Sequence, residues 1–189
     1  VKYVYGGIID IIMNEKNINK SIDFLQTSLK NLLNGKFGLD MLVITKSLRG
    51  YYKNPDSVAH KVLADRMAER DPGNKPKSND RIPFVYINIP EKKGSKILQG
   101  DRVEHPVFIQ DNKLSPDYKF YITNQIQKPV SQIFGLIVDT LPGFNKEPDY
   151  YNKKFKAYKK LHGEVKANNK ITSMRNDDAS ELLFGETIR

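Results

Sequence analysis

Apolar residues recur at helical spacing in the first third of the chain. They predict one amphipathic helix that ends at the polar run Asn17–Asn19, and a second that ends at Asn34-Gly35, a common signal for a helix C-terminus. The apolar run Leu39–Thr45 that follows is short and predicts a strand. The two helical stripes consist of Val4, Ile8, Ile9, Ile12 and Met13, and of Ile22, Leu25, Leu29, Leu32 and Leu33.

A third helix is predicted from Asn54-Pro55, where an Asn cap precedes a proline at the first helical position. It runs to about Arg70, and Asp71-Pro72-Gly73 ends it. Its apolar stripe comprises Ala59, Val62, Leu63 and Met67. On the opposite side we expect Lys61 with the small residues Ala64 and Ala68, which would let the helix approach another surface closely.

The middle of the chain predicts a small β element. Phe84–Ile89 is rich in β-forming residues and is bracketed by Pro83 and Pro90. Residues 91–96 are predicted to form a polar turn, and Ile97–Ile109 one or two further short strands. The expected fold class is therefore α+β and mostly helical, with a small antiparallel β element around residues 82–110.

The last third is again helical in pattern. Ser115-Pro116-Asp117 is expected to cap a long helix that Pro129 kinks or splits, and Tyr150–Lys166 predicts a lysine-rich helix. Asp177-Asp178 is interpreted as a solvated turn in a polar tail that ends in the apolar patch Leu182–Phe184. We predict a domain over residues 1–144 and a Lys-rich C-terminal extension over 145–189.

Charge points to an acidic partner. The 189 residues carry 31 Lys and Arg against 22 Asp and Glu, a net charge of +9, and such a balance favours association with polyanions. The excess is concentrated in residues 45–104 and 145–189. Lysine-rich solvated faces are also common without any partner, so this reading stays open.

Other features of the composition exclude several classes of function. The absence of Cys excludes disulfides, thiolate zinc sites and cysteine nucleophiles, and fits a reducing compartment. No apolar stretch is long enough to span a membrane, and no signal peptide is visible. The three histidines are scattered, and the phosphate-binding loop, dinucleotide and serine-elbow motifs are absent. On its residues alone the chain is a basic α+β binding module, and its start at Val1 predicts a piece of a longer protein.

The basic stretch from Lys46 to Arg81 is the candidate binding surface. Basic clusters often mark nucleic-acid surfaces, although for any single lysine a solvated surface charge is the commoner role. We expect Arg66 and Arg70 to form internal ion pairs with Asp65 or Glu69 instead. Tyr51, Tyr52 and Tyr86 could stack on bases or sugars, but aromatic side chains more often pack in a core. The candidate DNA-binding residues are Lys46, Arg49, His60, Lys61, Lys75, Lys77 and Arg81, with Gly73, Asp80 and Pro83 assigned to loop geometry.

Several separated blocks of the sequence, in order and in register, resemble the thumb region of family B DNA polymerases, above all the delta-type and large-DNA-virus members. The resemblance covers roughly residues 1–140. The blocks are Leu42–Leu48 (LVITKSL), Ala59–Ala64 (AHKVLA), Arg66–Gly73 (RMAERDPG), Asp80–Val85 (DRIPFV), Asp117–Ile122 (DYKFYI), Gln125–Pro129 (QIQKP) and Ile133-Phe134.

The resemblance implies a nucleotidyltransferase parent, a DNA-directed DNA polymerase whose thumb grips the primer–template duplex. The palm signatures of the YGDTDS and SLYP kind are absent from this chain. The fragment is therefore expected to be inactive alone and to bind no cofactor, whereas the palm of the full enzyme would hold Mg²⁺. The C-terminal cysteine clusters of delta-type members are also absent, which favours a viral member.

The resemblance also sets the expected partners. These are double-stranded primer–template DNA, the palm, fingers and exonuclease parts of the polymerase, and a possible processivity factor, with no membrane. The expected location is intracellular, in the nucleus or at a cytoplasmic viral replication site. The alternative is a non-catalytic helical interaction module that docks a replication partner through Leu182–Phe184 and the Lys-rich helix. Gln127, Val130, Ile133 and Phe134 loosely match a sliding-clamp peptide, but burial within their helix is the expected outcome.

Overall fold

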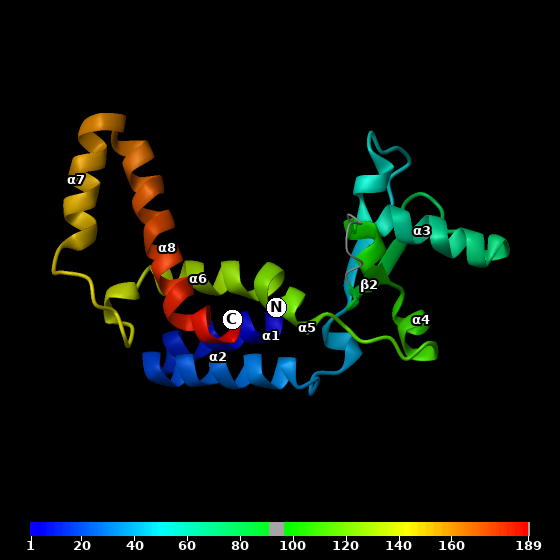
Figure 1. Ribbon diagram of the computed structural model, residues 1–189, viewed down its shortest axis with the longest axis horizontal. Helices are drawn as coiled ribbons and strands as arrows, with labels where there is room; N and C mark the ends of the chain where they lie inside the picture. The colour runs from blue at the N-terminus through cyan, green and yellow to red at the C-terminus, as the bar shows by residue number, and fades with distance from the viewer. Residues whose placement is uncertain (91–96, 189) are drawn as a thin grey trace. The chain divides into compact units, whose positions relative to one another are not determined.

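A computed structural model describes residues 1–90 and 97–188 (Figure 1). The predicted polar turn at 91–96 lies outside the described residues. The chain divides into two units: unit 1 comprises residues 1–34 and 122–189, and unit 2 comprises residues 35–121. The expected α+β, mostly helical fold with a small antiparallel sheet is confirmed. The boundary predicted at residue 144/145 falls inside unit 1.

The first two helices of unit 1 follow the predicted pattern. Helix α1 (Lys2–Asp10) continues into a π-helical turn (Ile11–Glu15), and α2 covers Ile18–Leu33. Asn17 caps α2, because its side chain accepts a 2.9 Å hydrogen bond from the backbone N–H of Lys20. A Cβ at Gly7 would lie 2.5 Å from the ring of Phe24, so glycine lets the two helices approach.

The predicted long helix around Pro129 is split just before the proline. Helix α5 (Tyr118–Tyr121) belongs to unit 2; a π-helical turn (Ile122–Ile126) and α6 (Gln127–Gly135) follow in unit 1. A proline ring collides with the carbonyl four residues earlier, which here is that of Gln125 inside the π-helical turn. The widened turn therefore stands where a regular α-helix would clash.

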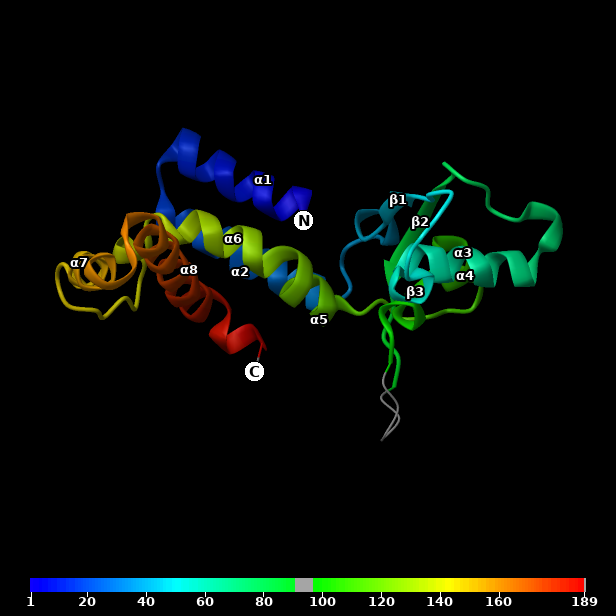
Figure 2. The ribbon, with the colours of Figure 1, turned by 90° about the horizontal axis from the view of Figure 1, so that it is seen from above.

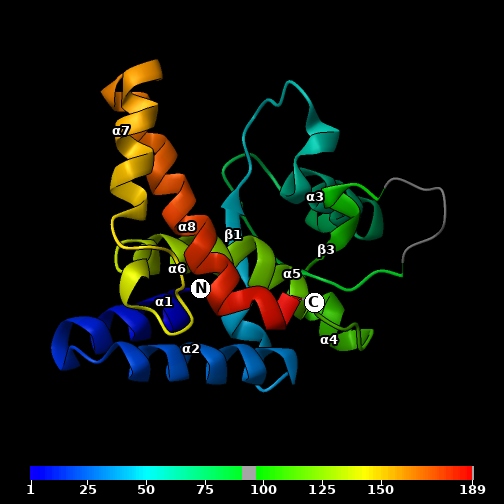
Figure 3. The ribbon, with the colours of Figure 1, turned by 60° about the vertical axis from the view of Figure 1, so that its left-hand side comes forward.

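The C-terminal segment departs most from its prediction. Helix α7 (Tyr150–His162) ends at Gly163, whose φ of 82° suits glycine, so the prediction that it runs to Lys166 is wrong. The expected polar tail is instead a long helix, α8 (Glu164–Ile188), that packs against α6 and α7 (Figures 2 and 3). Leu183 and Phe184 are buried in unit 1. Two of the three residues of the predicted apolar patch are therefore part of a core, whereas Leu182 is exposed.

Unit 2 is built on a three-stranded antiparallel sheet in the order β1-β2-β3. The strands are β1 (Ile44–Ser47), β2 (Arg81–Tyr86) and β3 (Val103–Glu104). The predicted second strand thus begins before Pro83, and Ile87 forms only an isolated bridge, to Pro116. Of the region 97–109 expected to be strand, only β3 is strand; Gln99–Arg102 is a 3-10 helix, and the end of the region belongs to helix α4 (Pro106–Asp111). Proline suits its first position and His105 accepts a hydrogen bond from the N–H of Val107 at its start.

Helix α3 covers Ala59–Arg70, and a 3-10 turn at Pro55–Ser57 precedes it. It therefore begins later than predicted, and the side chain of Asn54 makes no capping hydrogen bond. Leu63 and Ala64 are its buried residues. The expectation that Ala64 faces away from the core is wrong, because the sheet and the segment 99–104 both pack on α3.

Candidate nucleic-acid interface

The pairing of β1 with β2 gathers basic side chains from two distant stretches of sequence. Ser47 pairs with Arg81, and beyond that pair the N–H of Leu48 donates to the carbonyl of Asp80 at 2.9 Å. The N–H of Asn79 donates back to the carbonyl of Leu48 at 2.9 Å. The segment that carries Lys46 and Arg49 is thus joined by backbone bonds to the segment that carries Lys77 and Arg81.

The turn before β2 is fixed by its own polar groups. The carboxylate of Asp80 accepts a 2.7 Å hydrogen bond from the N–H of Lys77, and the N–H of Asp80 donates to the carbonyl of Lys77 at 3.1 Å. Asn79 takes the left-handed conformation, with φ of 72°. The role expected of Asp80 in loop geometry is confirmed. Pro83 lies in β2 opposite Thr45, so its assignment to the loop is wrong.

The basic groups of this end of the sheet face solvent. Lys46, Arg49, Lys75, Lys77 and Arg81 are all exposed. Among the described residues, no carboxylate forms an ion pair with any of them. We call these five residues the basic edge. Its positive charge is available to an external anion.

His60 lies beside the basic edge but is held by neighbours. Its Nε2 is 3.1 Å from the Tyr52 hydroxyl, which also accepts a 2.7 Å hydrogen bond from the N–H of Arg49. Its ring stacks on Phe84 at 6.4 Å. Desolvation lowers the pKa of His60, and the nearby positive charges of Lys46 and Arg49 lower it further, against a raising hydrogen bond with the backbone of Ser47. His60 therefore favours the neutral form near pH 7. Its contact with Tyr52 anchors the loop that follows β1.

Lys61 is less available than the basic edge. Its ammonium pairs with the carboxylate of Asp65, four residues on along α3, with Nζ to Oδ2 at 2.6 Å, and its side chain is 28% exposed. The candidate residues thus separate into a solvent-facing group and two residues, His60 and Lys61, with partners inside the chain.

The internal ion pairs of Arg66 and Arg70 exist, but with a different carboxylate. Arg70 makes a two-point interaction with Glu104 at 2.8 and 3.0 Å, and Arg66 lies 3.3 Å from the same carboxylate. Arg66 also donates to the carbonyl oxygens of Gly100, at 2.8 Å, and Val103. Asp65 and Glu69 are therefore not the partners. Glu104, which stands between Val103 and His105 in the sequence, was missed by sequence reasoning.

The three candidate tyrosines have different environments. Tyr51 is 80% exposed, whereas Tyr52 is half-buried and engaged with His60. Tyr86 is buried and stacks on Phe120 with 3.9 Å between ring centroids. Only Tyr51 among them has a ring that an external base or sugar could contact.

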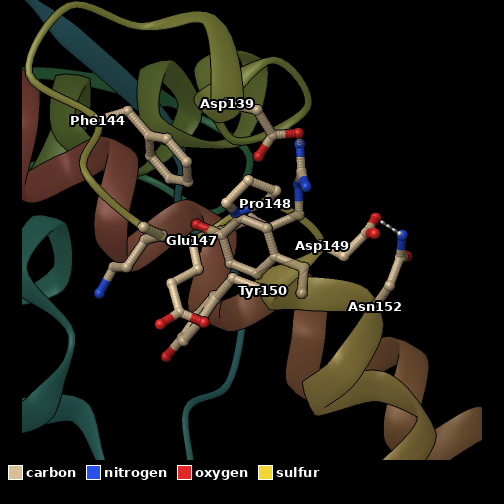
Figure 4. A pocket seen from close by; sticks show the side chains of 10 residues that line it. Asp139, Phe144, Glu147, Pro148, Asp149, Tyr150 and Asn152 are labelled. Atoms are coloured by element: carbon tan, nitrogen blue, oxygen red, sulfur yellow. Dashed lines mark hydrogen bonds and ion pairs between the residues drawn. The ribbon is translucent and has the colours of Figure 1, made fainter.

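Unit 1 contains an open pocket of about 430 Å³ at the start of α7 (Figure 4). Two of the residues that line it are Tyr151 and Arg175. The hydroxyl of Tyr151 donates a 2.6 Å hydrogen bond to Asp178, and Arg175 lies 4.6 Å from the Tyr151 ring centroid and pairs with Asp139 at 3.0 Å. Burial raises the pKa of Tyr151, and the hydrogen bond to Asp178 raises it further. The interpretation of Asp177-Asp178 as a solvated turn is therefore wrong, since Asp178 holds α7 against α8.

The charged groups of Arg175, Asp139 and Asp178 have partners within the protein. The residues that line the pocket include no nucleophile beside a general base. Within residues 1–90 and 97–188, no group of three or more His, Asp or Glu side chains is placed to hold a metal ion. No helix in the described part of the chain is both long and apolar enough to cross a membrane.

Comparison with known proteins identifies the family. Residues 1–137 match the model of DNA polymerase family B. The chain is 46% identical over 190 residues to a DNA polymerase of Pyramimonas orientalis virus, covering 100% of this chain and 16% of that protein. It is 51% identical over 142 residues to a DNA polymerase of Acanthamoeba polyphaga mimivirus, covering 74% of this chain and 8% of that protein.

More distant relatives agree. The DNA polymerase delta catalytic subunit of Caenorhabditis elegans is 32% identical over 135 residues, or 71% of this chain and 12% of that protein. A solved family B DNA polymerase of the archaeon Pyrobaculum calidifontis shares the fold, with a TM-score of 0.53 at 19% identity, over 77% of this chain and 18% of that one. The chain thus spans about a sixth or less of the curated relatives it matches. From its matched residues and its fold, the chain belongs to family B of the DNA polymerases.

Proposed function

We propose that this chain is the thumb region of a DNA-directed DNA polymerase and that its basic edge grips the primer–template duplex through backbone phosphates. The observation that carries the proposal is that five exposed cationic side chains, none of them in an ion pair with a described carboxylate, lie on the two segments that the β1–β2 pairing joins. The backbone bonds between Leu48, Asn79 and Asp80 hold that arrangement. Lysine and arginine contacts of this kind position a duplex without reading its sequence.

The chemical step belongs elsewhere in this proposal. Two metal ions that activate a 3′ hydroxyl and stabilise the leaving group need clustered carboxylates, which the described residues do not offer. We therefore place the Mg²⁺ site in a palm region that this chain does not contain. The contribution of this chain is affinity for the duplex, which sets how long the enzyme stays on its template.

The alternative, a module that docks a replication partner through Leu182–Phe184, loses its main support. Leu183 and Phe184 are 4% and 0% exposed, and both are covered within unit 1. Val130 and Phe134, from the loose sliding-clamp match, are also buried. A processivity factor would have to use other surfaces.

The experiment is a fluorescence-anisotropy titration of the chain with labelled duplex DNA at several salt concentrations. If four to six basic residues contact phosphates, the log–log salt slope should be about −4 to −5. Changing Lys75, Lys77 and Arg81 to Gln should reduce its magnitude by up to about 3 units. The matched control changes Lys2, Lys16 and Lys30, which are exposed in unit 1, and lowers the net charge by the same amount. An unchanged slope in the first variant contradicts the proposal.

A further inference from the structure

Helix α7 carries a second concentration of positive charge, in the segment outside the matched family model, which ends at residue 137. Its thirteen residues hold five lysines and no acidic residue. Of these, Lys159 pairs with Glu164 at 2.8 Å, and Lys153 lies 3.5 Å from Glu147. Lys154, Lys156 and Lys160 form no ion pair with any described carboxylate. The helix therefore presents net positive charge to solvent.

The aromatic and basic residues of α7 lie on opposite faces. Tyr151, Phe155 and Tyr158 recur at helical spacing and are less exposed than their neighbours, and Tyr151 bonds Asp178 of α8. At about 100° per residue, Lys153, Lys156 and Lys160 share the opposite side of the helix. Ala157, also exposed, lies among them. We call Lys153, Lys156, Ala157 and Lys160 the outer face of α7.

The outer face is held in place rather than carried on a loose tail. Helix α8 packs against both α6 and α7, and the guanidinium of Arg175 donates to the carbonyl oxygens of Gly135 and Leu136 at 2.8 and 3.1 Å. Ala167, Ala179 and Phe184 are fully buried. As Figures 1 and 3 show, α7 and α8 form a hairpin whose α8 arm continues along α6. The lysines of the outer face thus lie on an ordered helix within unit 1.

The spacing of these lysines suits a nucleic-acid backbone. From Lys153 to Lys160 the helix rises about 10 Å at 1.5 Å per residue. A DNA duplex presents one phosphate charge per about 1.7 Å of its axis, so several phosphates lie within that span. The small side chain of Ala157 leaves the helix backbone open to close approach between the lysines.

The distribution of apolar and aromatic groups argues against three other partners of the outer face: a membrane, a protein and single-stranded nucleic acid. A helix that lies on an anionic membrane needs an apolar face turned to the lipid, but the aromatic face of α7 is turned toward α8. Protein interfaces rely on exposed aromatic or arginine anchors, and the outer face has none. Single-stranded nucleic acid is bound largely by stacking on aromatic rings, which this face also lacks.

We propose that the outer face of α7 is a second phosphate-binding surface for duplex DNA, separate from the basic edge of unit 2. It adds affinity without sequence preference. This inference is independent of the role assigned to the basic edge, because different residues in a different unit carry it.

The first test is a salt titration of duplex binding by the full chain with Lys153, Lys156 and Lys160 changed to Gln. The magnitude of the log–log slope should fall by about 2 to 3 units. The variant with Lys2, Lys16 and Lys30 changed to Gln removes the same charge from the N-terminal part of unit 1 and should change the slope by less than about 1 unit. Equal effects of the two variants would show a general charge effect and overturn the proposal.

A second measurement locates the contact and is independent of affinity. Because the chain has no cysteine, Ala157→Cys can be labelled selectively with a photo-crosslinker, and Thr27→Cys on the exposed side of α2 serves as the control. Crosslinking to duplex DNA is expected at position 157, and much less at 27. Equal yields at both positions, or loss of anionic-vesicle binding rather than duplex binding in the lysine variant, would overturn the assignment.

The outcomes of the two proposals can be told apart. The variant of Lys75, Lys77 and Arg81 tests the basic edge, and the variant of Lys153, Lys156 and Lys160 tests α7. Thermal melting of each variant should match that of the unmodified chain, because every substituted residue is exposed.

Discussion

The carboxylate of Glu104 accepts hydrogen bonds from both terminal nitrogens of Arg70, at 2.8 and 3.0 Å, although the two residues are 34 positions apart in the sequence. Among the described residues, Glu104 is the only buried charged residue, with 5% of its surface exposed. Arg66, one turn before Arg70 in α3, lies 3.3 Å from the same carboxylate. The hydrogen bond to Glu104 is the main cause of a raised pKa of Arg70. This carboxylate therefore joins α3 to β3.

Replacing Glu104 by Ala should destabilise unit 2. The change leaves the guanidinium groups of Arg66 and Arg70 without their shared partner, and Arg66 is only 25% exposed. Breaking such a partly buried network costs about 2 to 4 kcal/mol. Chemical denaturation followed by circular dichroism measures the loss, with Glu69→Ala on the exposed side of α3 as the control. Similar stabilities of the two variants would show that the Glu104 contacts contribute little.

The close approach of Gly100 to α3 provides a second prediction. A Cβ at residue 100 would lie 2.6 Å from Val62, well inside normal contact distance. Gly100→Ala should therefore cost about 1 to 3 kcal/mol through overpacking. Val62→Ala in the same chain should recover part of that loss by vacating the space. A double variant no more stable than Gly100→Ala alone would place the strain elsewhere.

Stability should fall when the pH drops below the ordinary histidine pKa of about 6.5. Burial lowers the pKa of His60 and of His105 in the folded chain, so the unfolded chain binds more protons as the pH decreases. Stability then rises with pH through this window and levels off above it. His60→Gln should flatten the dependence in unfolding titrations between pH 5 and 7. A dependence as steep in His60→Gln as in the unmodified chain would contradict this assignment.

The local elements that the sequence predicted correctly are those in which cap and apolar pattern agree. Helix α2 has both, with Asn17 at its start and Asn34-Gly35 at its end. Helix α8 has neither a strong apolar stripe nor a breaker, and two of its buried residues, Ala167 and Ala179, are too small to mark a buried face in the sequence. Its helical form depends on packing against α6 and α7, which residue patterns do not reveal.

The candidate site could be predicted only in part for a related reason. Charge density along the sequence was enough to select Lys46, Lys75 and Lys77. The register of β1 with β2 places Lys46 opposite Ile82 and Ser47 opposite Arg81, and this long-range backbone pairing cannot be read from the sequence. The distinction between exposed lysines and the paired Lys61 likewise depends on the position of Asp65 on α3.

The isolated chain should show no primer extension with either Mg²⁺ or Mn²⁺. Template-directed synthesis needs carboxylates that hold two metal ions beside the 3′ hydroxyl, and within the described residues no cluster of acidic or histidine side chains could do so. The assay incubates a labelled primer–template with all four nucleotides and resolves the products on a denaturing gel. Traces of a contaminating polymerase are recognised with the variant of Lys75, Lys77 and Arg81, because extension by a contaminant would not respond to these substitutions. Extension that is lost in that variant, with binding weakened in parallel, would mean that this chain carries its own catalytic centre and would contradict its assignment as a thumb.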